Sequence, residues 1–570
     1  MTRAQKITDL AVSLLLLVAA AVYFSCRYGF HTINMEQLQL FEGTWRYFAD
    51  TVSLPGGCSD YLARFLTQFC YYAWSGALII AVLLVLSRCL LLALCRRKDG
   101  VVRALTFLPA ILLTMVMCYR FPTMNLLVAF DLTLAAALLV SRIGAPRTRR
   151  VVALVLAPAL YMLLGSFVLL YAVILAVRER RAAFGLAAVL LAVACPLVAY
   201  ALLPYPLGRL LYGLHYYKVH VDMPVWPWIA ALAAAFIVAL GETPVPQRSP
   251  RAWPALYAAV FVVAVPAVLL CSSASDEQSM KYNILTGKRM WNRVLNEATR
   301  KAPRTYSEIA CLNLALCKTG HLGGHMFDFH QDGPETLLPN ENTPHHDGLS
   351  TAEIFYQTGM VNNARRYCFE ALNAIPDYQK SAPVCKLLAE ICIVNGKYEL
   401  AREYLTALRH TLFYKKWAEE RLIPFREKTD PSLIDEYAQK RLERYKLGDD
   451  YIFDYSHADF TLRQLVEEYP GNLTAINYLL AWHLLTKNLG GFVAECPFEA
   501  FTTAVPKAWQ EGFLLDWVQS GGSMENLPSF ISEQEANLIQ AFSRDFDANV
   551  PMDEMQRRYG NTYWFYYFFK

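Results

Sequence analysis

The chain has 570 residues, of which 55% are apolar and 18% are charged, and its formal net charge is +4. Residues 1–271 carry 22 basic and 10 acidic side chains, whereas residues 272–570 carry 31 and 39. The basic residues form short clusters beside apolar stretches, which excludes a general nucleic-acid-binding protein. The division predicts an all-α protein: a polytopic transmembrane helical bundle over residues 1–271, followed by a soluble α-solenoid over residues 272–570.

Nine apolar stretches of the first part are candidate membrane spans, because about 20 apolar residues cross a hydrocarbon core of about 30 Å. The first follows Arg3 and Lys6, and we expect it to be retained; a cleaved signal peptide or a lipoprotein site at Cys26 is the alternative. The stretch 151–177 is long for one helix and basic at both flanks, so we predict a hairpin that turns near Gly165 and Ser166. The candidate spans lie near residues 7–25, 73–94, 103–119, 125–141, 151–164, 167–177, 183–203, 226–240 and 254–271.

Short loops rich in Lys and Arg stay on the cytoplasmic side of a membrane, and this rule orients the spans. With a cytoplasmic N-terminus, the inner loops hold 15 basic residues and the outer segments hold six. Nine crossings then place residues 272–570 outside the cytoplasm. The lipid bilayer is the first partner that the sequence predicts.

The outward loop 26–72 is too long for a simple connector. Apolar residues recur at helical spacing on both sides of Pro55, Gly56 and Gly57, which predicts two amphipathic helices lying at the membrane interface. The first would contain Leu38, Phe41, Trp45 and Phe48, and the second would contain Tyr61, Phe65 and Phe69.

Several ionisable residues on the outward face are candidates for a functional site. Glu36 and Glu42 lie in the loop 26–72 with Arg46 and Arg64, where each could also be an ordinary surface charge. Asp131 lies inside the fourth span, where an acid costs about 2.5–3.5 kcal/mol and therefore faces the bundle interior, in a structural or a functional role. A second outward segment, residues 205–222, could be an interfacial tyrosine belt or a site for an anionic lipid or sugar phosphate. Its candidates are Arg209, His215 and Lys218.

The second part contains two segments that match the second half of a tetratricopeptide unit. Their offset is 37 residues, and small residues stand where paired helices would approach closely. We expect a solenoid of roughly four to six hairpins with a groove for a protein or peptide. The matching positions are Gly359, Val361, Ala364, Cys368, Ala371 and Pro376, and then Gly396, Tyr398, Ala401, Leu405 and Leu408.

Two further segments of the second part have composition of their own. The histidines between residues 321 and 346 match no metal-binding pattern, so we predict a solvated loop and no metal site, and no cofactor can be named. The aromatic run Tyr563–Phe569 is expected to pack on the last hairpin or back toward the membrane; a partner peptide is the alternative.

The chain resembles an uncharacterised family of polytopic membrane proteins from Bacteroidota, in which such a bundle precedes an outward tetratricopeptide-like domain. Four segments carry the resemblance: residues 36–41, 61–69, 314–320 and 411–420. The resemblance implies the bacterial inner membrane and a periplasmic C-terminal domain, and it brings no assigned activity. In layout alone the bundle is loosely similar to GT-C glycosyltransferases, which place an acid in the long loop after their first span, here best matched by Glu36.

The sequence favours two functions over a third, a transporter. In the first, the protein transfers a sugar from a polyprenyl-phosphate donor, with Glu36 or Glu42 as general base and Asp131 as a further candidate acid. Arg46, Arg64, Arg209 or Lys218 would then hold the phosphate leaving group, with His215 nearby. In the second, the protein is a membrane-anchored scaffold whose solenoid groove binds an envelope protein.

Overall fold

The structure, a computed structural model, describes residues 3–213, 224–243, 253–340, 348–375, 380–446, 454–501 and 504–570. All regular secondary structure in these residues is helical, which confirms the predicted all-α class. By packing, the chain divides into two units. The first comprises Met1–Glu277, Ile375–Ala382 and Ala407–Glu419, and the second comprises Gln278–Ala374, Pro383–Thr406 and Glu420–Lys570.

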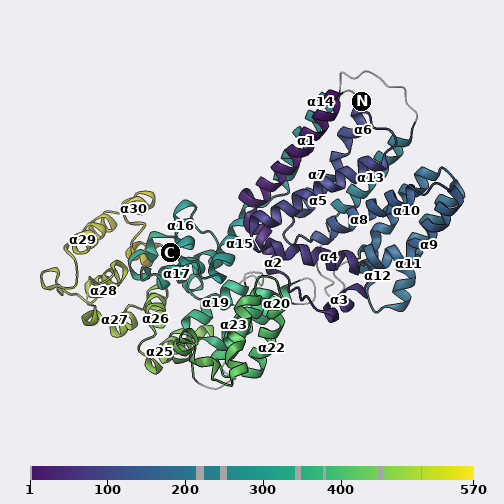
Figure 1. Cartoon of the computed structure of the whole chain (residues 1–570). Coiled ribbons are helices and arrows are strands. Elements are labelled where there is room, and N and C mark those ends of the chain that lie inside the picture. Colours follow the sequence, from purple (N-terminus) through teal and green to yellow (C-terminus); the bar gives the residue numbers. More distant parts are fainter. Residues whose placement is uncertain are drawn as a thin grey trace. The chain divides into compact units, whose positions relative to one another are not determined.

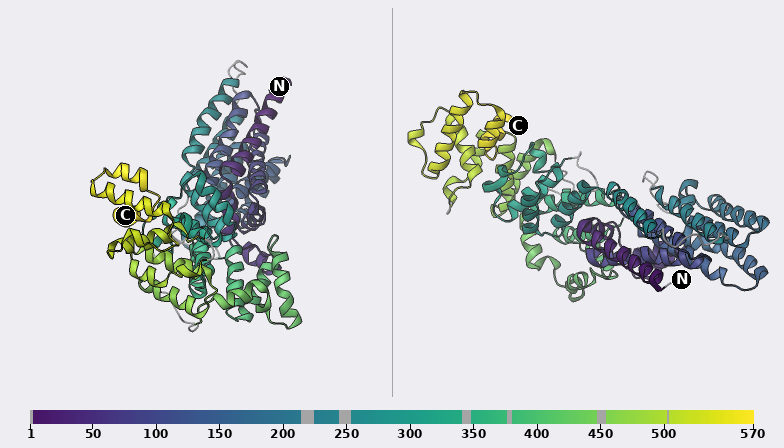
Figure 2. Two further views of the ribbon diagram at one scale, coloured as in Figure 1. Left: turned by 90° about the vertical axis from the view of Figure 1, so that its left-hand side faces the viewer. Right: turned by 90° about the horizontal axis from the view of Figure 1, so that it is seen from above.

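The first unit is built around long apolar helices that lie side by side (Figures 1 and 2). Helix α5 packs against α1, α7 and α8, and α10 packs against α11 and α13. The helices are α1 (Arg3–Val22), α2 (Gly29–Gln37), α3 (Trp45–Val52), α4 (Gly57–Thr67), α5 (Ala73–Leu94), α6 (Gly100–Leu105), α7 (Phe107–Met117), α8 (Met124–Ser141), α9 (Pro146–Leu164), α10 (Val168–Glu179), α11 (Ala182–Leu202), α12 (Leu207–Tyr212), α13 (Trp226–Glu242) and α14 (Trp253–Leu270).

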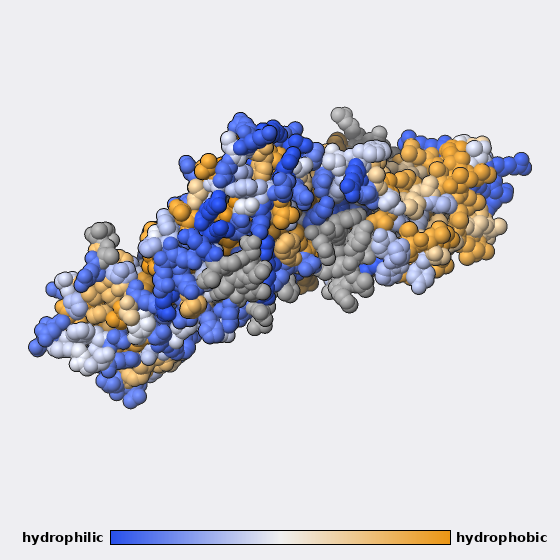
Figure 3. All heavy atoms as spheres, turned by 90° about the horizontal axis from the view of Figure 1, so that it is seen from below, coloured by the Kyte–Doolittle hydropathy of each residue, from blue (hydrophilic) through white to orange (hydrophobic). Residues whose placement is uncertain are grey.

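Six stretches among the described residues are long and apolar enough to cross a membrane, and a seventh appears if α14 and the following helix count as one span. The predicted nine also include the shorter α13 and divide 146–179 in two. Apolar side chains cover much of the visible surface of this unit (Figure 3), and Leu139, Leu232 and Val262 are among those more than half exposed. The chain is a multi-pass helical membrane protein on this evidence. The six stretches are Ile7–Arg27, Ala73–Leu94, Gly100–Met117, Met124–Ser141, Pro146–Glu179 and Ala182–Leu202.

The stretch Pro146–Glu179 turns back on itself. The Tyr171 hydroxyl donates a hydrogen bond to the Ala153 carbonyl at 3.3 Å, although 18 residues would separate them by about 27 Å in one straight helix. At the open end, Arg149 and Arg150 both pair with Glu179. Helices α9 and α10 therefore form the hairpin that the basic flanks predict.

The hairpin turns at a point where three glycine backbones meet. Gly56, Gly165 and Gly213 all have positive φ angles, of 76°, 69° and 78°. A Cβ atom at Gly165 would lie 3.3 Å from Gly213 Cα, and one at Gly56 would lie 3.1 Å from the Gly213 oxygen. The missing side chains thus let the α3–α4 connection, the α9–α10 turn and the end of α12 touch.

The second unit consists of shorter helices in pairs, such as α19 with α20 and α25 with α26 (Figure 1). The turn after α19 contains Gly359 (φ 104°), and the turn between α21 and α22 contains Gly396 (φ 71°). The helices that follow α14 are α15 (Ala274–Gly287), α16 (Trp291–Arg300), α17 (Tyr306–Lys318), α18 (Leu322–His325), α19 (Gly348–Thr358), α20 (Val361–Ala374), α21 (Ala382–Val394), α22 (Tyr398–Arg409), α23 (Lys415–Glu427), α24 (Asp435–Glu443), α25 (Ala458–Glu468), α26 (Leu473–Leu485), α27 (Leu489–Glu495), α28 (Lys507–Gln519), α29 (Glu533–Asp547), α30 (Met552–Tyr559) and α31 (Tyr563–Phe569).

The aromatic C-terminal run forms α31 and packs on α28, as the first of the sequence alternatives proposes. Tyr563 and Trp564 are fully buried. The Trp564 indole donates to the Glu511 carbonyl at 2.9 Å, and the Tyr566 hydroxyl donates to the Leu485 carbonyl at 2.7 Å. The run therefore forms part of the core of the second unit.

Candidate functional site

Three short helices, α2, α3 and α4, lie between α1 and α5 in the chain and form what we call the loop layer, residues 28–72. The break at 55–57 is present, but the first predicted amphipathic helix begins at Trp45 and not at Leu38. The reason is visible in the backbone. The Gln39 carbonyl accepts from Ala382 N at 3.0 Å, and Gly43 N donates to the His410 carbonyl at 2.9 Å, so this stretch bonds outside any helix.

A polar pocket opens between the loop layer and the connection that precedes α8. In it, Asp60 Oδ2 accepts a hydrogen bond from Arg64 Nε at 2.8 Å, and Asp60 Oδ1 accepts one from Asn125 Nδ2 at 3.3 Å. The two charged side chains stand one helical turn apart in α4 and are only 16% and 11% exposed. The pocket holds about 510 Å³, including the space at its mouth, and is lined by Met35, Leu38, Gln39, Asp60, Ala63, Arg64, Thr67, Phe121, Pro122, Thr123, Met124, Asn125 and Ile375.

Neighbouring groups fix the charged pair of the pocket in place. Gln39 Nε2 donates to the Arg64 carbonyl at 2.9 Å, which joins α4 to the end of α2. The buried Tyr47 hydroxyl lies close to the same pair; burial raises the pKa of Tyr47 to about 12, and the Arg64 charge opposes that rise. The phenol is therefore protonated at neutral pH. The pocket thus presents a carboxylate, a guanidinium and amide groups in fixed positions.

Glu36, the acid expected in the loop after the first span, is buried with only 4% exposed. Its Oε2 accepts hydrogen bonds from the Tyr414 hydroxyl and from Gln37 Nε2, each at 3.3 Å. Burial and the Glu36 carboxylate hold the pKa of Tyr414 well above its usual value. The preceding residue, Phe413, stacks on Tyr71 with 4.8 Å between the ring centroids. Glu36 is thus fixed in an aromatic core and does not line the described pocket.

Glu42 is held by an ion pair with Lys380, with 3.0 Å between Oε1 and Nζ. Beside it, the Ser381 hydroxyl donates to the Gln37 carbonyl at 2.6 Å, and Leu412 N donates to Gln68 Oε1 at 3.1 Å. Residues 380–382 and 410–414, which we call the clasp segments, therefore bind the loop layer through side chains and backbone together.

The other predicted site residues are not gathered into one place. Arg46 is exposed and lies 3.9 Å from Asp50. Asp131 is buried in α8, where one oxygen accepts from the Ser87 hydroxyl and Oδ2 has no hydrogen-bond partner among the described residues. Arg209 is buried in α12. His215 and Lys218 lie outside the residues that the structure describes.

A model of the family of unknown function DUF6057 matches residues 3–570. The chain belongs to this family. The match covers both units. It agrees with the predicted resemblance to a family that has no assigned activity. No curated protein and no solved structure matches the chain.

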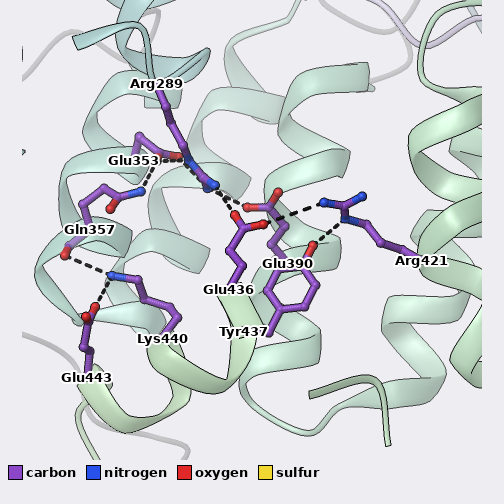
Figure 4. Close-up of polar contacts among 9 residues, drawn as sticks. All are labelled: Arg289, Glu353, Gln357, Glu390, Arg421, Glu436, Tyr437, Lys440 and Glu443. Carbon is purple, nitrogen blue, oxygen red and sulfur yellow. Dashed lines mark hydrogen bonds and ion pairs between the residues drawn. The ribbon is translucent and has the colours of Figure 1, made fainter. Parts of the chain in front are cut away.

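In this DUF6057 member, the second unit contains a buried ionic cluster (Figure 4). The Arg289 guanidinium contacts three carboxylates, at 2.6 Å to Glu353, 2.6 Å to Glu390 and 2.7 Å to Glu436. Arg421 lies 3.7 Å from the other Glu436 oxygen. The carboxylates come from α19, α21 and α24, so one guanidinium joins three helices. We interpret the cluster as a structural link, because its buried carboxylates are all engaged by this arginine.

Sequence reasoning missed part of the pocket. Asp60 is not among the predicted site residues, although its spacing of four from Arg64 on a helix was a usable signal. Asn125 gives a weaker signal, as a polar residue at the start of an apolar span. No local sequence pattern predicts that the Asn125 side chain contacts Asp60 in α4.

Proposed function

We propose that this DUF6057 protein is a membrane-anchored scaffold of the cell envelope, whose second unit is a tetratricopeptide-like solenoid that binds a protein partner. The helix pairs support this proposal. Helices α19 and α20 are joined through Gly359, and α21 and α22 through Gly396, at the same places in both predicted repeats. Ala364 and Ala401 are fully buried, as small residues at a close helix contact would be.

The observation that carries the proposal is that other side chains already bind the two predicted catalytic acids. Glu36 binds Tyr414, and Glu42 binds Lys380. A general base needs to reach a substrate hydroxyl, whereas these carboxylates bind the clasp segments. These contacts lie within the first unit, where they hold the loop layer in place. Both predicted acids thus have a structural role there, which leaves partner binding by the second unit as the better-supported function.

The test is site-specific photocrosslinking of the full chain in its native membrane. Phe369 on α20 and Leu400 on α22 are each nearly half exposed, so a photoreactive residue can replace either one without loss of core packing. We expect one discrete protein adduct from these positions. The same residue at Val518 on α28, which is similarly exposed, serves as the matched control. The absence of any adduct from α20 and α22, or equal adducts from all three positions, contradicts the scaffold.

Orientation belongs to the same proposal, with a cytoplasmic N-terminus and a periplasmic second unit in the inner membrane. The basic inner loops support it. In a chain freed of its exposed cysteines Cys26 and Cys89, a cysteine at Trp45 is expected to react with an impermeant maleimide in spheroplasts, and one at Arg147 only after lysis. The reverse pattern contradicts this orientation.

The second candidate is transfer of a sugar from a polyprenyl-phosphate donor, and the pocket favours it. The carboxylate that lines this pocket is Asp60, so the base of such a reaction moves from Glu36 to Asp60. Native mass spectrometry of the purified protein tests it by a retained polyprenyl phosphate. Loss of that lipid in Arg64→Gln but not in Arg46→Gln supports the candidate, and its absence from the wild-type protein argues against it.

A further inference from the structure

One end of the helical bundle gathers three arginines around a buried carboxylate. Glu242, the last residue of α13, has only 3% of its side chain exposed. Its Oε1 lies 3.3 Å from Arg96 and 3.8 Å from Arg178, and its Oε2 lies 3.9 Å from Arg180. Arg96 follows α5, and the other two arginines stand at the end of α10. This arginine cluster thus lies at the ends of three apolar helices, where a bilayer has its headgroups.

Hydrogen bonds to the backbone hold these helix ends together. Arg97 N donates to the Gly241 carbonyl at 3.0 Å. A Cβ atom at Gly241 would lie 3.0 Å from Cys95 Cβ, so the ends of α5 and α13 approach each other closely. Arg178 Nη1 donates to the Leu94 carbonyl at 2.8 Å and joins the end of α10 to that of α5. The fold itself therefore sets the positions around Glu242.

Arg180 is held in an uncommon conformation. Its backbone is left-handed, with φ of 52° and ψ of 26°, which few residues other than glycine, asparagine and aspartate adopt. Its guanidinium donates to the backbone carbonyl of Glu242. The side chains of Arg180 and Arg96 are 56% and 59% exposed, so a ligand can reach both. Two accessible guanidinium groups are thus directed to one place.

Positive charge exceeds negative charge in the arginine cluster. Three guanidinium groups face the single Glu242 carboxylate, and neither of its oxygens has a hydrogen-bond partner among the described residues. The N–H donors of the arginines are therefore not used up by this carboxylate. On the neighbouring hairpin, Arg149 and Arg150 share Glu179, and the Arg149 charge also acts on Arg178. This pairing adds a further positive charge.

The residues nearest in sequence that lie outside the described part of the chain cannot supply a compensating acid. Residues 244–252, which follow α13, contain two arginines and no Asp or Glu. Residues 1–6 contain no acid either. Arg97 and Asp99, next to the cluster in sequence, form a neutral pair at 2.6 Å. The arginine cluster is therefore suited to an anion.

We infer that the arginine cluster binds the phosphate group of an anionic phospholipid. A guanidinium can donate two parallel hydrogen bonds to phosphate, which is why arginine is favoured at phosphate sites. Basic sites between membrane spans are typical of headgroup binding. The acyl chains also have a surface to contact on α13. Ile229, Leu232 and Phe236 are exposed there at helical spacing, and they form an apolar stripe on the helix that ends at Glu242.

This inference goes beyond both proposed functions and rests on neither of them. The loop layer directly precedes α5 and the arginine cluster follows it, and the 22 residues of α5 span about 33 Å. A polyprenyl phosphate in the Asp60–Arg64 pocket is therefore a different ligand in a different place. A phospholipid at the arginine cluster neutralises arginines that repel one another and joins the ends of α5, α10 and α13.

The experiment is native mass spectrometry of the detergent-purified full chain, supplied with equal amounts of phosphatidylglycerol and phosphatidylcholine of matched acyl chains. We expect the wild-type protein to retain phosphatidylglycerol preferentially. Arg96→Gln/Arg180→Gln is expected to lower this preference at least about fivefold, the contribution of a single basic residue near a membrane surface. The matched control is Arg142→Gln/Arg147→Gln, which removes two exposed arginines at the adjoining ends of α8 and α9 and is expected to keep the preference.

An excess of inorganic phosphate distinguishes a lipid site from a general anion site. We expect the lipid to stay bound, because free phosphate has no contact with the apolar stripe; displacement by phosphate overturns the lipid assignment. Thermal unfolding checks that each variant is folded. Arg96→Gln alone, at a side chain that makes no hydrogen bond to the described residues, replaces the double variant if that variant unfolds, with an expected loss of about fivefold. Equal retention of both lipids by the wild-type protein, or equal losses in variant and control, also overturns the inference.

Discussion

The side chain of Glu511 accepts a hydrogen bond from the backbone N–H of Tyr563 at 2.8 Å, at the first residue of α31. Glu511 is completely buried in α28, and its Oε1 has no hydrogen-bond partner among the described residues. The charged groups that face it are Lys507, at 3.8 Å, and more distantly Glu535 and Asp328. One carboxyl group thus ties the C-terminal helix to the second unit.

This contact predicts a pH dependence of the attachment of α31. Burial raises the pKa of Glu511 to about 8, from about 4.5 in the unfolded chain, against the opposing effect of Lys507. A raised pKa means that the folded state holds the proton more tightly. The stabilisation is therefore complete below pH 4.5 and falls by at most about 1.4 kcal/mol per pH unit until pH 8.

Hydrogen exchange of peptides over Tyr563–Phe569, corrected for the intrinsic rate, measures this opening free energy. In Glu511→Gln, which keeps an acceptor but cannot ionise, we expect the pH slope to flatten between pH 5 and 8. The exposed Glu525→Gln on the same unit is the control and keeps the wild-type slope. An unchanged slope in Glu511→Gln shows that another group governs the attachment.

Arg289→Met is expected to loosen the second unit. It leaves Glu353 and Glu390 buried without their cation, and removal of one partner of a buried ion pair costs about 3–5 kcal/mol. We expect a loss of stability at the lower end of this range, because a quarter of the Arg289 side chain is exposed. Hydrogen exchange in α19 measures the loss, and Arg300→Met, a surface residue 3.7 Å from Glu297, is expected to cost less than about 0.5 kcal/mol. Equal effects of the two substitutions contradict the role of Arg289 as a link.

Gly165→Ala is expected to destabilise the first unit by about 1–3 kcal/mol, because φ is 69° there and ψ is −148°, a region that only glycine adopts readily. The new Cβ atom also lies 3.3 Å from Gly213 Cα. A lower thermal midpoint of the detergent-purified chain measures this loss. Gly144→Ala is the control, since its Cβ atom would meet nothing within 4 Å. A midpoint as high as that of the control contradicts the three-glycine junction.

The parts of the fold that the sequence predicts are those set by local composition. The apolar runs predict the long helices, the arginines at both flanks of 151–177 predict the α9–α10 hairpin, and glycines at 359 and 396 predict turns between helices. Each signal lies within a few dozen residues. Helix formation and turning depend on such neighbours, so these features can be read along the chain.

The clasp segments could not be predicted in the same way. Glu42 and Lys380 are 338 residues apart, and Ala382 N binds the Gln39 carbonyl, a group that every residue has. No sequence pattern predicts the contacts of Arg289 with three helices either, because they depend on its left-handed backbone conformation, with φ of 55°. The pocket shares this limit. Its Asp60–Arg64 pair follows from helical spacing, but the contact with Asn125 is tertiary.

The contact between Glu36 and Tyr414 allows a test of whether Glu36 has a structural or a catalytic role. Tyr414→Phe removes the hydroxyl that donates to Glu36 Oε2, which leaves a buried carboxylate with one donor fewer and is expected to cost about 1–3 kcal/mol. Tyr72→Phe, at a tyrosine of the loop layer that is half exposed, is the matched control. Thermal unfolding of the full chain measures both. A catalytic Glu36 predicts the opposite pattern, in which Tyr414→Phe unfolds at the wild-type temperature and Glu36→Gln, equally stable, loses its activity in a reconstituted glycosyl-transfer assay.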